Sequence, residues 1–345
     1  MQYYNLEFSE ADVREAAAAG RLLSMEIEVS RRCNFRCRYC YVPHEAELQG
    51  ELSRVELEDA IEQARALGAR KIILLGGEPS IYPELKELIE FLSDRGAEIE
   101  LFTNGSGIDS NMAAFLADHR VRVVLKMNSR KPEVQDRLAG LPGAARIIDR
   151  AFTALRRAGY PGAGRFLAVS TVICRQNIDE LEELWRWLRQ EAIEPYFEII
   201  TPQANAQTNT WLQPEPGAVR DLFFRLATID REEFGHRWDP QPPLVGNRCM
   251  RHQVSCLLTA QGEVMPCVGV TIPLGNIRQR PLAEILRTSD VIANLKNYRQ
   301  RITGPCRDCD KADGCYGCRG AAYQLTGDYL ASDPTCWRNG GCSSA

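Results

Sequence analysis

The first two-thirds of the chain alternate between short β-rich runs and longer stretches with helical periodicity. Six runs rich in Val, Ile and Leu predict strands, and several are almost continuously apolar, as parallel strands covered by helices are; they lie at 25–30, 71–75, 98–103, 121–127, 166–174 and 196–201. The helical patterns between them have marked ends, including a capping box of Ser53 and Glu56, a start at Pro83 and a stop at Gly96. Strands alternating with helices predict an α/β fold. Six units indicate an open, partial (β/α)6 TIM-like barrel.

The pattern changes after Pro202. A proline-rich stretch follows, with one helix near 216–227, and then a hairpin pattern with strands at 254–258 and 264–268. Helical patterns at 281–288 and 290–299 precede a Gly- and Cys-rich tail. We therefore expect four parts: an N-terminal extension (1–23), the barrel (24–203), a bridging segment (204–248) and a small Cys-rich α+β domain (249–345).

Composition adds one unusual feature, the cysteines. The hydrophobic fraction of 44%, the charged fraction of 26% and the formal charge of −4 are ordinary and give no reason to expect nucleic-acid binding. No apolar stretch approaches the roughly 20 residues of a membrane helix, and the first residues lack a secretory signal, so we expect a cytoplasmic protein. Twelve of the thirteen cysteines lie in three groups, at 33–40, 249–267 and 306–342. Clustered cysteines without an export signal favour metal ligation in a reducing compartment over disulfides.

The first cysteine group follows the first predicted strand. Cys33, Cys37 and Cys40 have the spacing C-x3-C-x2-C, and four arginines at 31, 32, 36 and 38 surround them. Three thiolates in one loop can hold three irons of a [4Fe–4S] cube and leave the fourth iron without a protein ligand. A zinc knuckle is the alternative. The position at the carboxyl end of a barrel strand favours a functional site.

This trio, with Tyr39 before its last cysteine, resembles the motif of the radical S-adenosylmethionine (SAM) enzymes. The resemblance continues in Gly76-Gly77-Glu78-Pro79 at the end of the second strand, where the family carries a GGEP motif, and in Thr103-Asn104-Gly105 at the end of the third. Asn177 follows the fifth strand in a familiar context. The resemblance covers most of 24–203.

The resemblance implies a cofactor arrangement. SAM would chelate the open iron through its amino and carboxylate groups, and reductive cleavage would give a 5′-deoxyadenosyl radical that abstracts a substrate hydrogen atom. Glu78 and the backbone of Gly76 and Gly77 would receive the amino group, and the Tyr39 region would contact adenine. The expected cofactor-binding set is completed by Pro79, Asn104, Lys126 and Asn128.

Two interpretations remain open for the end of the fourth strand. Many relatives have a serine where Lys126 stands and an acid near Asn128. Lys126 either pairs with the cofactor's carboxylate while Asn128 bonds the ribose, or both are ordinary strand-end residues.

The later cysteines resemble the SPASM domain, an auxiliary-cluster module of some radical SAM enzymes. Cys249-x12-Gly262-x4-Cys267 matches its opening, and the spacing from Cys306 to Cys318 follows its closing motif, one residue short before Cys318. The family arrangement implies one or two auxiliary [4Fe–4S] clusters, and the count favours two. The inner cluster would use Cys249, Cys256, Cys267 and Cys318, and the outer cluster Cys306, Cys309, Cys315 and Cys336.

Alternatives also exist for this module. Two zinc sites would satisfy the same cysteines. Cys256 is either a ligand or a small buried apolar residue, and in the second case the inner cluster has an open iron. We expect His252 to be an exposed loop histidine, with donation to a cluster sulfur or the substrate as the alternative.

Cys174 lies at the end of the fifth strand, where its thiol either returns a hydrogen atom to a substrate radical or packs in the core. Cys342 is expected to be a surface thiol near the C-terminus. Polar residues near strand ends are candidates for substrate contact: Arg165, Glu198, Gln203 and Asn205.

These features favour an enzyme over an iron–sulfur electron carrier or a zinc-binding protein. About 23 residues precede the first strand, which favours a small polar substrate, sugar- or aminocyclitol-like, or a short peptide without a leader, over a leader-bearing peptide. We expect two-electron oxidation through the auxiliary clusters, with electrons from a donor such as flavodoxin or ferredoxin. The alternatives are a peptide- or protein-modifying maturase of the thioether, crosslink or formylglycine type, and a radical epimerase.

Overall fold

The computed structural model describes residues 8–43 and 48–339. Its strands are β1 (Ser24–Ser30), β2 (Lys71–Gly76), β3 (Glu98–Thr103), β4 (Arg122–Lys126), β5 (Leu167–Ile173), β6 (Glu194–Ile199), β7 (Leu257–Leu258), β8 (Glu263–Met265) and β9 (Gly275–Asn276). The helices of the N-terminal two-thirds are α1 (Glu10–Ala18), α2 (Arg54–Ala66), α3 (Leu85–Asp94), α4 (Ser110–Asp118), α5 (Pro132–Ala139), α6 (Ala144–Arg157), α7 (Leu181–Gln190), α8 (Asn205–Thr208) and α9 (Pro216–Ile229). The C-terminal helices are α10 (Arg251–Val254), α11 (Leu282–Thr288), α12 (Asp290–Lys296), α13 (Tyr298–Arg301) and α14 (Arg319–Thr326).

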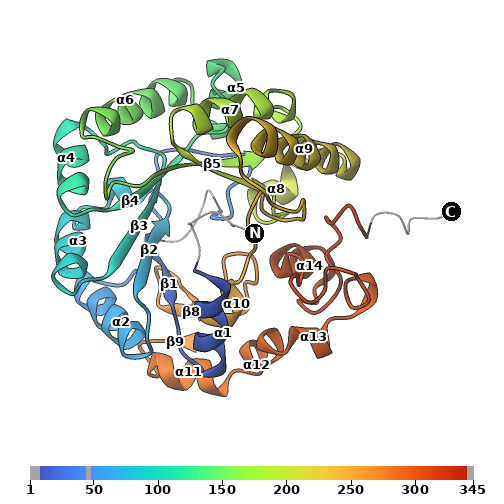
Figure 1. Ribbon diagram of the computed structural model, residues 1–345. Coiled ribbons are helices and arrows are strands. Elements are labelled where there is room, and N and C mark those ends of the chain that lie inside the picture. Colours follow the sequence, from blue (N-terminus) through green and yellow to red (C-terminus); the bar gives the residue numbers. More distant parts are fainter. Residues whose placement is uncertain (1–7, 44–47, 340–345) are drawn as a thin grey trace.

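The first six strands form the predicted parallel sheet. Their order is β6-β5-β4-β3-β2-β1, each strand pairing with the next along the chain. Figure 1 shows α2, α3, α4 and α6 on the outer side of this curved sheet. The expectation of a partial α/β barrel is therefore confirmed.

The cysteine-rich segment does not form a sheet of its own. Strand β7 pairs in parallel with β1, and β8 and β9 continue antiparallel, so one nine-stranded sheet runs through both parts. The predicted strand over 254–258 is shorter, because Val254 belongs to α10 and only Leu257–Leu258 pairs as a strand. The apolar side chain of Val254, which contributed to the strand prediction, instead packs with Val13 and Ala16 of α1. Thus part of the expected N-terminal extension, α1, lies against the module.

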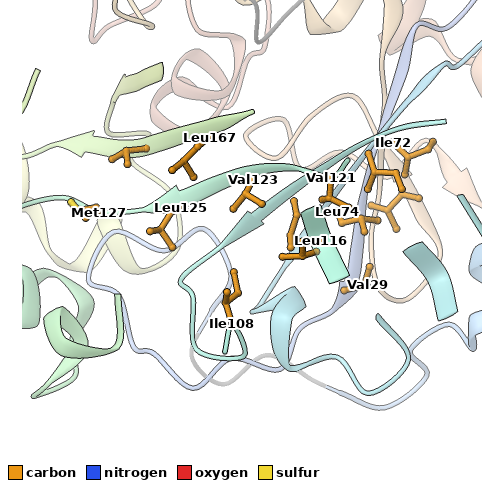
Figure 2. Close-up of a cluster of buried hydrophobic side chains, with 14 of the residues drawn as sticks. Val29, Ile72, Leu74, Ile108, Leu116, Val121, Val123, Leu125, Met127 and Leu167 are labelled. Atoms are coloured by element: carbon orange, nitrogen blue, oxygen red, sulfur yellow. The ribbon is translucent and has the colours of Figure 1, made fainter. Parts of the chain in front are cut away.

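One face of the strands carries the hydrophobic core. Figure 2 shows Val29, Ile72, Leu74, Val123 and Leu125 in a single buried cluster. Each fully buried aliphatic side chain of this kind contributes roughly 1.5–3 kcal/mol. The barrel wall therefore holds the strand ends in fixed register.

On strand β1, the face opposite the hydrophobic core carries acidic side chains. All seven of its residues are buried, but Met25, Ile27 and Val29 belong to the core, whereas Glu26 and Glu28 alternate with them. Since successive side chains of a strand point to opposite faces, both carboxylates face the barrel interior.

Among the described residues, none of the helices is both long and apolar enough for a membrane span.

Candidate active site

The three-cysteine loop leaves β1 and is fixed by backbone contacts. The amides of Arg36 and Arg38 donate to the carbonyls of Ala139 and Leu138 at the end of α5, each at 3.0 Å. Gly140 is required beside them, because a Cβ there would lie 2.1 Å from the Arg36 carbonyl oxygen and its φ is +63°. The loop is therefore positioned by the barrel and not only by its own sequence.

The glycine pair at the end of β2 lies directly against this loop. The amide of Gly77 donates to Ser30 O at 2.8 Å, and the amide of Glu78 donates to Arg32 O at 2.7 Å. A Cβ on Gly76 would lie 2.4 Å from Ser30 O, and one on Gly77 would lie 2.1 Å from Arg32 O. Two glycines are needed here because no side chain fits between the strand end and the loop.

The carboxylate of Glu78 lies inside the structure, with only 3% of the residue exposed. It accepts hydrogen bonds from the Ser80 amide at 2.9 Å, the Asn104 amide at 2.6 Å and the Thr103 hydroxyl. Burial raises its pKa, and the hydrogen bonds from Ser80, Thr103 and Asn104 oppose that shift. Glu78 thus joins the ends of β2 and β3, and its contact with the cofactor's amino group stays a prediction. Pro79 opens the short 3-10 turn that follows.

The thiols of the loop are suited to a metal cluster. Burial raises the pKa of Cys33 and Cys37 to about 12 and that of Cys40 to about 11. Cys33 Sγ accepts hydrogen bonds from the Phe35 amide at 3.4 Å and from Asn104 Nδ2 at 3.9 Å. Burial thus opposes ionisation of the free thiols, so iron has to displace their protons, and N–H donors to sulfur stabilise the thiolate once it is bound. These residues fit the [4Fe–4S] group that their spacing predicts.

A cavity of about 230 Å³ adjoins the loop and reaches into the barrel. The loop cysteines, Tyr39 and the Gly76–Glu78 segment form one part of its wall, and Val268, next to Cys267 of the module, contributes to another. Two ion pairs also line it. Lys126 Nζ lies 3.7 Å from Glu198 Oε1, and Arg251 Nη1 lies 2.9 Å from Glu26 Oε1.

Glu26 and Arg251 are lining residues that sequence reasoning missed. Arg251 comes from α10 in the module and also donates to the Tyr196 hydroxyl at 3.3 Å. Burial raises the pKa of Glu26, and the Arg251 charge opposes the shift. A signal for Glu26 was present, because acidic residues alternate with apolar ones in SMEIEVS. Nothing local marks Arg251 as a barrel contact.

The candidates at the end of β4 separate in space. Lys126 lines the cavity and donates to Ser170 Oγ at 3.0 Å. Asn128 is fully buried, donates to the Tyr39 hydroxyl at 2.5 Å and accepts from the Val172 amide at 2.9 Å. Asn128 therefore holds the Tyr39 side chain by a hydrogen bond but does not line the cavity itself, whereas Lys126 lines the cavity.

Cys174 also lies outside the cavity wall. It is fully buried in an apolar cluster with Leu138, Val172 and Leu212, and burial raises its pKa to about 12. This placement agrees with the core alternative, since a hydrogen-atom donor has to reach the substrate.

The other candidates near the strand ends divide in the same way. Glu198 and Gln203 line the cavity. The Asn205 amide instead donates to Cys40 O at 3.2 Å and fixes the loop, and Arg165 lies beside Gly159 at the far side of α6.

The module's cysteines form two groups. In the inner group, burial raises the pKa of Cys318, and Asp333, Cys267 and Cys249 are the charges that add to the shift. In the outer group, burial raises the pKa of Cys315 and of Cys336, and both lie near Cys306; Cys309 is a further neighbour of Cys315. Cys306, Cys315 and Cys336 are therefore within electrostatic reach of one another, and their joint binding of an outer cluster with Cys309 stays a prediction. Cys342 lies outside the described residues.

Cys256 and His252 differ from the simplest expectations. Cys256 is 1% exposed and belongs to the main hydrophobic core with Leu258. The expectation of an exposed His252 was wrong. This residue, on α10, is only 3% exposed. Burial lowers the pKa of its imidazole to about 3, and the positive charges of Arg319 and Arg251 add to this shift.

The side-chain spacing bears on the zinc alternative. In the part of the chain that the structure describes, no three or more His, Cys, Asp or Glu side chains converge tightly enough to hold a single metal ion. A cube distributes its ligands over four irons, whereas zinc draws four ligands onto one ion. The same cysteines could serve either kind of site, and the family matches that follow bear on the choice.

Comparison with known proteins agrees with this geometry. Residues 27–188 match the model of the radical SAM superfamily, and residues 249–310 match the SPASM iron–sulfur cluster-binding domain. The chain is 32% identical to a PqqA peptide cyclase of Streptomyces rochei over 92% of this chain and 90% of that protein. It is 25% identical to an AdoMet-dependent heme synthase of Methanosarcina barkeri, over 92% and 96% of the two chains.

A solved structure shows the same fold. The crystal structure of Streptococcus suis SuiB bound to S-adenosylmethionine superposes with a TM-score of 0.71 at 15% identity, covering 96% of this chain and 84% of that one. This likeness shows the fold, and the two family matches establish the cofactors as [4Fe–4S] clusters and S-adenosylmethionine. The chain belongs to the radical SAM superfamily and carries a C-terminal SPASM domain.

Proposed function

We propose that this chain is a peptide-modifying radical SAM oxidoreductase that oxidises one residue of a peptide by two electrons. The observation that carries the proposal is the 32% identity with a PqqA peptide cyclase, which extends over 92% of the chain. Similarity of this extent includes both the barrel, which would bind SAM, and the cysteine-rich module, which would accept an electron. Both would be needed for a reaction of the same type.

In this proposal the barrel residues bind and orient SAM. Cys33, Cys37 and Cys40 hold a cluster whose fourth iron is left to the cofactor. A cluster bound there would supply the electron for reductive cleavage of SAM, and hence the means to abstract a substrate hydrogen atom. The Gly76–Gly77 backbone lies beside the loop and receives the amino group, while Lys126, in reach of the cavity, pairs with the carboxylate.

The interior of the barrel then receives the substrate residue. Its buried carboxylate, Glu26, is already paired with Arg251, so a substrate can exchange hydrogen bonds there without leaving an unpaired charge buried. One substrate hydrogen atom converts the radical to 5′-deoxyadenosine. A second would leave as a proton, and its electron would go to an iron–sulfur cluster held by the module's cysteines, for which we propose an inner and an outer cluster. The oxidised peptide thus lacks two hydrogen atoms.

A small polar molecule is the second candidate substrate. The mixed charges and the modest volume of the cavity, about 230 Å³, also suit a sugar- or aminocyclitol-like compound. We further propose that the protein works in a reducing cytoplasm. Exposed Arg32, Arg36 and Arg38 around the loop suit an acidic one-electron donor of the flavodoxin or ferredoxin type.

The test uses anaerobically reconstituted protein with SAM and dithionite. The probes are synthetic peptides that match short open reading frames adjacent to the gene, and the matched control is Cys33→Ala. We expect one 5′-deoxyadenosine for each peptide that loses two hydrogen atoms, measured by mass spectrometry. SAM cleavage that no such peptide accelerates, combined with oxidation of a sugar-like compound, contradicts the peptide assignment. Failure to cleave SAM with full iron loading contradicts the radical mechanism itself.

A further inference from the structure

The inner cysteine group brings three thiols together from three separate segments. Cys249 precedes α10, Cys267 follows β8, and Cys318 caps the start of α14. The last two segments cross at Gly269 and Gly320, where a Cβ on Gly269 would lie 2.7 Å from Gly320 Cα. Cys249 packs against the cluster of Val124, Ala168 and Tyr196 inside the barrel. The group therefore lies next to the barrel interior.

Cys256 is on the opposite side of the sheet. Strand β7 pairs with β1 so that Leu257 is opposite Glu26 and Leu258 is opposite Ile27. Because side chains alternate along a strand, Cys256 shares the face of Leu258 and Ile27, and all three belong to the main core. Glu26 faces the cavity from the other side. A thiol on the core face is poorly placed to join the three others, which leaves the inner group one ligand short.

His252 is a buried side chain of the same segment, and its imidazole can bind iron. Two residues separate it from Cys249, the same separation as in C-x2-C pairs of metal ligands. Its ring centroid is 5.4 Å from that of Tyr316, whose hydroxyl contacts Cys249 Sγ at 3.4 Å. Among the described residues, its Nδ1 has no hydrogen-bond partner, although the residue is 3% exposed. A buried ring nitrogen without a partner is costly and rare, and a metal ligand role removes the cost.

We propose that His252, and not Cys256, is the fourth protein ligand of the inner auxiliary cluster, which is then bound by Cys249, Cys267, Cys318 and one imidazole. The proposal rests on the assignment of an inner cluster, but not on a peptide substrate. Replacing one thiolate by a neutral imidazole removes a negative charge and raises the reduction potential of an iron–sulfur centre. The inner cluster is thereby suited to accept an electron from the barrel.

The experiment isolates the auxiliary clusters in the full chain. Cys33, Cys37 and Cys40 are changed to Ala together, and the protein is prepared anaerobically with 15N-labelled histidine. We expect about eight irons per chain, four for each cube, and a directly bound 15N coupling in the pulsed EPR spectrum of the reduced protein. In this background His252→Gln removes the coupling, and Cys256→Ala, the matched control, retains both the coupling and the iron.

A rescue variant separates ligation from folding. His252→Cys is expected to keep about eight irons, lose the nitrogen coupling and shift one cluster to a lower reduction potential, because a thiolate restores the negative charge. Absence of 15N coupling in the reduced parent protein overturns the proposal, even if His252→Gln fails to fold. The proposal is also overturned if the Cys256→Ala variant loses about four irons per chain while the His252→Gln variant loses none. The parent spectrum is independent of substrate, so failure of the peptide assay leaves this result interpretable.

Discussion

The cysteines of the barrel and those of the module are held in different ways. Cys33, Cys37 and Cys40 belong to one continuous loop, and its shape is set by backbone hydrogen bonds to α5 and by the glycines of β2. The inner and outer groups instead collect thiols from segments far apart in sequence. In the first region local spacing already defines the ligand set, whereas in the second the ligand set depends on how the chain folds back. We expect the loop to leave one corner of its cube for SAM, and the module to bind its cluster or clusters through protein ligands alone.

Replacing one cysteine in each region gives the largest expected contrast. Cys37→Ala removes a ligand of the SAM-binding cluster, so we expect 5′-deoxyadenosine formation to fall to the level without enzyme and about four irons to be lost. Cys309→Ala also loses about four irons but still cleaves SAM, because the outer group is remote from the loop. Iron analysis and chromatography of 5′-deoxyadenosine check both. Equal loss of cleavage in the two variants would show that the regions are not separable.

Adding one methyl group at matched glycines sharpens the contrast. A Cβ at Gly77 lies 2.1 Å from Arg32 O, so Gly77→Ala displaces the loop, and a shift of about 1 Å in a reacting geometry costs about 10²-fold in rate. A Cβ at Gly320 lies 2.8 Å from Gly269 Cα and 3.6 Å from Cys318 Sγ. Gly320→Ala is expected to disturb the inner cluster's EPR signal and leave SAM cleavage within about threefold, since it acts away from the loop. A normal rate for Gly77→Ala would contradict the role of this close contact.

The smallest expected effect concerns hydrogen bonds to sulfur. Asn339 Nδ2 donates to Cys306 Sγ at 3.1 Å, and Asn104 Nδ2 donates to Cys33 Sγ at 3.9 Å. Donors of this kind stabilise the more negative, reduced cluster, so Asn339→Ala should lower the outer cluster's reduction potential by the equivalent of about 1 kcal/mol. Asn104→Ala should shift the SAM-binding cluster less, because its contact is longer. EPR-monitored redox titration measures both, and a larger shift for Asn104→Ala would reverse the ranking.

The sequence alone was enough for the parts of this protein that local pattern defines. Apolar runs separated by helical patterns predicted the six parallel strands, and β3, Glu98–Thr103, has the predicted bounds. The capping box of Ser53 and Glu56 is present at α2. The three-cysteine loop and the Gly-Gly-Glu-Pro segment follow strand ends, as expected, because parallel strands bring their carboxyl ends to one edge.

Only the tertiary structure decided which distant side chains meet. The register of β7 on β1 turns Cys256 toward the core, and the packing of α10 buries His252 and brings Arg251 to Glu26 inside the barrel. Spacing within a segment constrains neighbours along the chain, but the face on which a residue lies depends on a partner strand more than two hundred positions away. A two-residue strand such as Leu257–Leu258 has too little pattern of its own to specify that register.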